Sequence, residues 1–137
     1  MPIGYLTNYE DITMKIRTLL ISSLLAVTLV FPSLSFAAAP VTSNGVTTIH
    51  LDEYNGYFAA NETLAGLKPG KYRIVISNKA DKLVGFLLQD GVTHEKLDMF
   101  PLEPGQSRTI TANFTENGFR YRCPINPTPW YDVGVSK

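Results

Sequence analysis

The sequence predicts an all-β fold for the region after residue 37, a small sandwich or barrel of about seven or eight short strands. Apolar and polar residues alternate one by one in Lys71–Asn78 and again in Arg108–Thr115. A period of two is typical of strands that bury one face. Asn-Gly, Asp-Gly and Pro-Gly pairs separate these segments from their neighbours, and such pairs mark turns.

The remaining elements follow from the same pattern. Lys82–Gln89 is apolar on both faces, which predicts a central strand. Asn61–Leu67 is a weak helix candidate that Gly66 keeps short. Further strands are expected near Val46–Leu51, His94–Phe100, Gly118–Cys123 and Trp130–Val135.

The N-terminal region has the features of a secretory signal peptide. Lys15 and Arg17 precede an apolar run, Leu19–Val30, and small residues follow up to the expected cleavage point after Ala37. An uncleaved membrane anchor is the alternative, but a span needs about 20 apolar residues and this run is shorter. We therefore expect a periplasmic protein with no stable membrane insertion after cleavage.

Processing at this point divides the chain into two parts. Residues 1–37 are an N-terminal extension with the signal peptide, and Met14 is a plausible true start. Residues 38–137 are a single domain, which is long enough to bury a core without cross-links.

Composition excludes several classes of function. Lys and Arg together count 12, as do Asp and Glu, so the formal charge is zero and no basic field exists to bind nucleic acid. One cysteine rules out an internal disulfide and a multi-cysteine zinc site. The motifs of serine hydrolases, zinc proteases and phosphate-binding loops are missing, so we do not expect an enzyme.

The cysteine is the residue with most chemical potential. Alternation places Phe119, Tyr121 and Cys123 on one face of a late strand. Three prolines in Pro124–Pro129 make the next loop stiff. A thiolate beside a stiff loop is a reasonable ligand for a soft metal ion, whereas a small buried apolar side chain is the alternative. The residues leave both interpretations open.

Four segments of the predicted domain carry recognisable motifs: PGKYRIVISNKA (Pro69–Ala80), LLQDG (Leu87–Gly91), LEPGQSRTITANF (Leu102–Phe114) and GFRYRC (Gly118–Cys123). Asn126-Pro127 follows the cysteine. Together these segments resemble the cupredoxin superfamily, and more narrowly the cupredoxin domain of EfeO-type periplasmic iron-uptake proteins.

The resemblance implies a Greek-key β-sandwich but not a blue-copper centre. Such a centre needs two histidines, a cysteine and usually a methionine. No His or Met follows Cys123, and Val84–Phe86 stands where the family has its other histidine. The strand with paired glutamates in the EfeO-type domains corresponds to Gly85–Leu88, which is apolar here.

The resemblance also implies a ligand set in which acidic residues join the cysteine. It selects Cys123, Glu95 and Asp98, with copper the expected ion and iron a second option. Alternation places Glu95 and Asp98 on opposite faces of a strand, so a bulge or loop would have to bring them together.

Three weaker ligand candidates complete the set, and each has a simpler interpretation. His94 could be a surface residue, Met99 a core residue and Asp90 a turn residue before Gly91.

Two functions are therefore expected from the sequence. The first is a metal-binding module that supports iron or copper handling, with a periplasmic or inner-membrane iron-uptake component as partner. The alternative is a metal-free interaction domain that kept the cupredoxin fold and lost the copper site.

Overall fold

The computed structural model describes residues 32–33 and 35–135. The chain divides into two units, Met1–Ser35 and Phe36–Lys137, and every strand belongs to the second unit. The predicted signal sequence up to residue 31, including the possible start at Met14, lies outside the described residues. In the described part of the chain, no helix has the length and hydropathy to cross a membrane.

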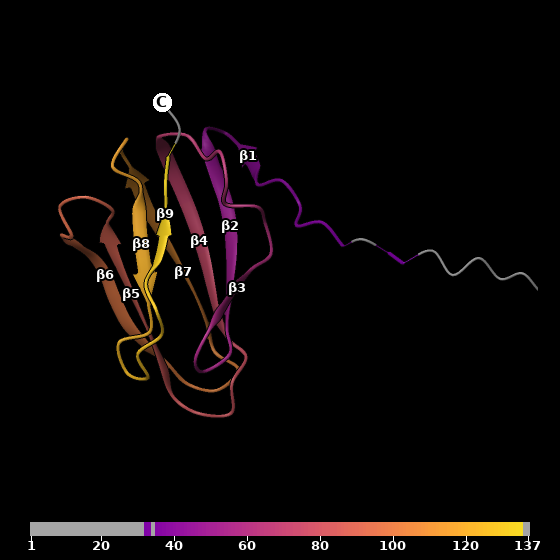
Figure 1. The fold of residues 1–137 in the computed structure, drawn as a ribbon, viewed down its shortest axis with the longest axis vertical. Helices are drawn as coiled ribbons and strands as arrows, with labels where there is room; N and C mark the ends of the chain where they lie inside the picture. Colours follow the sequence, from indigo (N-terminus) through magenta and orange to yellow (C-terminus); the bar gives the residue numbers. More distant parts are fainter. Residues whose placement is uncertain (1–31, 34, 136–137) are drawn as a thin grey trace, which may run out of the picture. The chain divides into compact units, whose positions relative to one another are not determined.

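Two sheets form the second unit (Figure 1). One has the order β1-β2-β4-β7 with β3 paired to β2, and the other has the order β6-β5-β8-β9. The strands of the described residues are β1 (Val41–Ser43), β2 (Val46–Glu53), β3 (Phe58–Ala60), β4 (Gly70–Asn78), β5 (Val84–Asp90), β6 (Lys96–Leu102), β7 (Ser107–Phe114), β8 (Phe119–Arg122) and β9 (Tyr131–Val133).

The chain crosses between the sheets at β4–β5, β6–β7 and β7–β8. Strands β2 and β4 are parallel, and every other pair is antiparallel. The inward side chains of both sheets meet in one hydrophobic core. This arrangement confirms the predicted all-β, cupredoxin-like β-sandwich.

The described residues contain nine strands, against the seven or eight predicted, and the two outside the predicted ranges are β1 and β3. Each has three residues, which is too short for alternation to be recognised. The predicted helix at Asn61–Leu67 is wrong, because this segment forms a turn and isolated bridges at Glu62 and Leu67. Gly66 adopts a positive φ of 75° there, which ends any regular helix.

Strand β5 is the central strand that the sequence predicts. It lies between β6 and β8, and its first five residues are buried. Asn78 fixes the connection that leads into it: the buried side chain donates to the carbonyls of Lys82 and Leu102 at 2.8 and 3.0 Å, and accepts from Ala80 N–H at 2.8 Å. These bonds hold the start of β5 beside the cysteine described next.

Candidate functional site

Cys123 directly follows β8 and faces the core, as alternation predicts. Phe119, Tyr121 and Cys123 are all buried, and the cysteine has no exposed surface. Its sulfur accepts two backbone hydrogen bonds, from Gly85 N–H at 3.3 Å and from Asn126 N–H at 3.4 Å. The strand β5 and the proline loop therefore both contact the same sulfur atom.

The loop after the cysteine is tied down at three points. Thr128 Oγ1 accepts from Cys123 N–H at 3.2 Å and donates to the Pro129 carbonyl at 2.9 Å. Asn126 Nδ2 donates to Asn55 Oδ1 at 2.7 Å, which links the loop to the β2–β3 turn. Prolines and these bonds together hold the sulfur in one place.

A buried carboxyl group, which the sequence analysis did not select, lies beside the thiol. Glu53 ends β2 and is fully buried. Neither of its oxygens has a well-formed hydrogen bond among the described residues, and Cys123 is the side chain that interacts with it. A buried carboxylate without partners is costly, so this group demands a proton or a cation.

The pKa values of the pair follow from this environment. Burial raises the pKa of Glu53 to about 7, although contact with the thiol works in the opposite direction. Burial and the nearby Glu53 carboxyl raise the pKa of Cys123, against the effect of the backbone N–H groups that point at the sulfur. Both groups consequently favour their protonated forms, and both can release a proton to an entering cation.

Alternation would have identified Glu53 if the predicted strand had been longer. Ile49, Leu51 and Glu53 share one face of β2, and all three are fully buried. The sequence predicts a strand only as far as Leu51, two residues short of Glu53. An acidic residue in register with a core face is the signal that was missed.

The structure places three of the predicted ligands at the opposite end of their sheet. Asp90 is the turn residue of the simpler interpretation, with Oδ1 accepting from the backbone N–H groups of Val92 and Thr93. Its N–H donates to the Glu95 carbonyl, and His94 is an exposed neighbour with a φ of 60°. About 16 Å of strand separates Asp90 from Gly85, whose backbone N–H donates the hydrogen bond to Cys123 Sγ.

The other two predicted ligands, Asp98 and Met99, lie in the middle of β6. Asp98 pairs with Leu88, and its carboxylate accepts from Met99 N–H at 2.8 Å. Met99 pairs with Leu87 and is 52% exposed, so it is not a core residue. The described residues bring no three His, Cys, Asp or Glu side chains together around a metal position. The ligand set drawn from the resemblance is therefore not assembled around Cys123.

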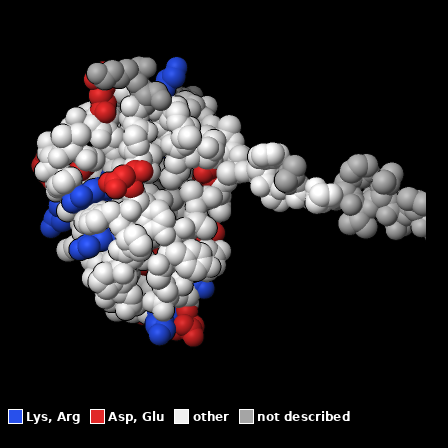
Figure 2. Space-filling view, in the orientation of Figure 1, with Lys and Arg blue, Asp and Glu red and all other residues white. Residues whose placement is uncertain are grey.

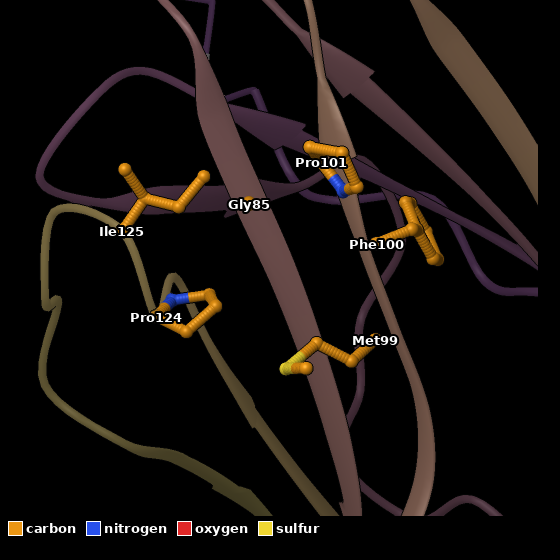
Figure 3. A pocket seen from close by; sticks show the side chains of 6 residues that line it. All are labelled: Gly85, Met99, Phe100, Pro101, Pro124 and Ile125. Atoms are coloured by element: carbon orange, nitrogen blue, oxygen red, sulfur yellow. The ribbon is translucent and has the colours of Figure 1, made fainter.

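A small apolar pocket lies next to the proline loop (Figure 3). Pro124 and Ile125 lie on one side of β5 and Phe100 and Pro101 on the other, with Gly85 between them, and the side chain of Met99 reaches across β5 toward Pro124. A Cβ atom at Gly85 would be only 3.0 Å from Pro124 Cδ and 3.1 Å from Ile125 Cγ1. The loop thus fills the space that a side chain at this position would need. The pocket measures about 190 Å³ and is lined by Gly85, Met99, Phe100, Pro101, Pro124 and Ile125.

No protein-family model and no curated protein matches the chain. Among solved structures it is similar to a multicopper oxidase, at 13% identity and a TM-score of 0.45, over 70% of this chain and 45% of that one. It is also similar to a laccase from Pediococcus acidilactici, at 14% identity and a TM-score of 0.45, over 74% of this chain and 29% of that one. The chain spans less than half the length of either protein. Likeness at this level identifies neither a function nor a ligand.

The strand topology and the site define the class of protein. The chain is a cupredoxin-like β-sandwich with a buried thiol–carboxyl pair, Cys123 and Glu53, at one end of its core.

Proposed function

We propose that the protein is a periplasmic metal-binding module in which one ion replaces the protons of Cys123 and Glu53. The observation that carries this proposal is the Glu53 carboxyl, which is fully buried beside the thiol with both oxygens unpartnered among the described residues. A cation between the two groups would relieve the cost of the buried charge.

The donor set favours copper, with iron as the second option. A thiolate is a soft ligand that suits Cu(I), whereas a carboxylate suits harder ions such as Fe(II). The N–H groups of Gly85 and Asn126 already point at the sulfur, and they would stabilise the thiolate formed on binding. Two protein ligands leave the ion open to a further ligand from a partner, which suits transfer rather than permanent storage.

The cellular setting is part of the same proposal. The signal-peptide features of the N-terminal region support export to the periplasm. The motifs shared with EfeO-type domains support an iron-uptake component of the periplasm or inner membrane as partner. The chain would then bind and pass on an ion without catalysing a reaction itself.

A metal titration with paired variants tests the site. Residues 38–137 suit this experiment because Phe36–Lys137 is one compact unit with its own core. Cu(I), Cu(II) and Fe(II) are added separately, and one-to-one binding with proton release is expected for at least one ion. Cys123→Ser should abolish binding, and Glu53→Gln should weaken it about tenfold or more, the equivalent of about 1.4 kcal/mol.

The control separates this site from the one that the resemblance implies. The double variant Glu95→Gln/Asp98→Asn should bind metal as the unmodified protein does, because both groups lie away from the thiol. Binding that survives Cys123→Ser but fails in the double variant would contradict the proposal. Circular dichroism and cooperative thermal unfolding confirm that each variant is folded.

The metal-free interaction domain is the second candidate, and a specific observation favours it. Pro124 and Ile125 pack against Gly85, and the thiol has no exposed surface, so an ion could enter only if this loop moved. If no ion binds more tightly than about millimolar, this second function is the one supported.

A further inference from the structure

The outer face of the sheet β6-β5-β8-β9 carries a cationic stack. Two arginines lie over the ring of Trp130: the guanidinium carbon of Arg120 is 3.9 Å from the ring centroid, and that of Arg122 is 4.5 Å. Arg120 is held further by Gln89, whose side-chain oxygen accepts from Nε at 2.8 Å. The stack is therefore fixed in place before any partner arrives.

The arginines keep most of their charge available. Within the described part of the chain, the one ion pair is His50–Glu62, so neither guanidinium is neutralised at salt-bridge distance. Asp132 is the cross-strand neighbour of Arg120 and offsets part of the charge. Arg122 Nε is buried without a hydrogen-bond partner among the described residues. Figure 2 shows basic side chains gathered next to acidic ones over β8 and β9, beside a large uncharged area.

The apolar pocket lies on the same face as the stack. Met99, Leu87 and Arg122 form one row across β6, β5 and β8, so the backbones of Met99 and Arg122 are about 10 Å apart. Leu87 is buried although it does not belong to the core, and Ile125 at the pocket rim is 46% exposed. Pocket and stack therefore form one surface, called here the Arg-Trp-Arg surface.

We propose that the Arg-Trp-Arg surface docks an acidic segment of a partner protein. One apolar side chain of the partner would enter the pocket, and neighbouring carboxylates would bind Arg120 and Arg122. The pocket, at about 190 Å³, is smaller than the roughly 300–1,000 Å³ of typical small-molecule sites, which favours a single side chain. Trp and Arg are also the residues that most often dominate binding energy at protein interfaces.

This inference goes beyond the metal site and does not depend on it. No contact of the proposed partner involves the sulfur or the Glu53 carboxyl, which lie on the core side of the sheets. Docking would place the partner against Pro124 and Ile125, the two residues after the thiol. The surface would therefore serve either of the two functions considered above.

An NMR titration of ¹⁵N-labelled residues 38–137 tests the proposal. The probe is a short capped peptide with one leucine flanked on each side by two glutamates. We expect shifts of the Trp130 indole N–H and of the backbone amides of Arg122, Gly85 and Ile125, weaker at high salt. A peptide with alanine for leucine, and one with lysines for glutamates, should each bind about tenfold or more weakly.

Variants of the protein locate the binding site. Arg122→Gln and Ile125→Ser should each weaken binding of the peptide about tenfold, the equivalent of about 1.4 kcal/mol. Arg73→Gln and Val92→Ser are matched controls, since both residues are exposed and lie elsewhere, and they should leave binding unchanged. Cys123→Ser should also bind the peptide normally, so failure of the metal site and failure of docking give different results.

Several outcomes would overturn the inference. One is the absence of any shift up to millimolar peptide, and another is equal weakening by the matched controls. Binding to vesicles of phosphatidylglycerol in place of the peptide would identify a membrane as the occupant. Self-association that Arg122→Gln abolishes would identify a second copy of the chain.

Discussion

The carboxyl of Glu53, at the end of β2, lies beside the thiol of Cys123, at the end of β8. The two strands belong to different sheets, so only the packing of the sandwich brings the groups together. Both are fully buried, and burial raises the pKa of each group. The Glu53 carboxyl raises the pKa of the thiol further, whereas the thiol lowers that of the carboxyl. The pair is therefore the most chemically distinctive feature of the core.

The stability of the metal-free protein should fall as pH rises. The pKa of Glu53 is raised in the folded chain from 4.5 to about 7. The contribution of this carboxyl to stability is therefore complete below pH 4.5 and is lost as pH rises through 7. A loss of a few kcal/mol is expected between pH 5 and 8. Urea unfolding at both pH values measures it.

Glu53→Gln should remove this dependence, because the amide does not ionise. The exposed Glu116 offers a matched control, and Glu116→Gln should keep the pH dependence of the unmodified protein. If the free energy of unfolding changes equally with pH in the unmodified protein and in Glu53→Gln, Glu53 does not titrate in this range.

Gly85→Ala should destabilise the protein by about 1–3 kcal/mol through overpacking. The new methyl group would lie 3.0 Å from the rigid ring of Pro124 and 3.1 Å from Ile125. Displacement of the loop should also expose the sulfur, so Cys123 should react faster with a thiol reagent such as dithionitrobenzoate. Gly134→Ala is the control, because its methyl group would contact nothing within 4 Å. Equal effects of both substitutions would argue against a tight fit at Gly85.

Glu62→Ala should cost about 1–3 kcal/mol of stability, since it leaves a backbone donor unpaired. The carboxylate of Glu62 accepts from His50 N–H at 2.7 Å and from His50 Nδ1 at 2.6 Å, beside the end of β3. Glu62→Gln, which keeps an acceptor for the backbone, should lose less. Glu116→Ala serves as the exposed control, with an expected change within about 0.5 kcal/mol. Chemical unfolding measures the stability of the three variants. Equal stabilities would contradict a stabilising role for the hydrogen bonds between His50 and Glu62.

Asp90 should titrate at unusually low pH. The N–H groups of Thr93 and Val92 bind its carboxylate and lower its pKa from 3.8 to about 2. Its contribution to stability is therefore present above pH 3.8 and is lost as pH falls through 2. Carbon-detected NMR titration of the carboxyl group measures this value directly. An ordinary pKa at Asp90 would show that the turn is not formed in solution, as would a pKa that Thr93→Pro leaves unchanged.

The sequence by itself determined the class of fold. Alternation in Lys71–Asn78 and Arg108–Thr115 defined β4 and β7, because a strand that buries one face must repeat every two residues. The same rule placed Cys123 on the core side after β8, and the apolar run in Lys82–Gln89 predicted the central strand β5. These features depend only on neighbours along the chain.

The tertiary structure alone decided which groups meet. Glu53 and Cys123 come from different sheets, and the register of β5 and β6 fixes Glu95 at the end opposite to Gly85. Periodicity tells which face a side chain occupies, but not which side chain of the other sheet it opposes. That pairing depends on how the two sheets stack, a long-range property that no local pattern in the sequence contains.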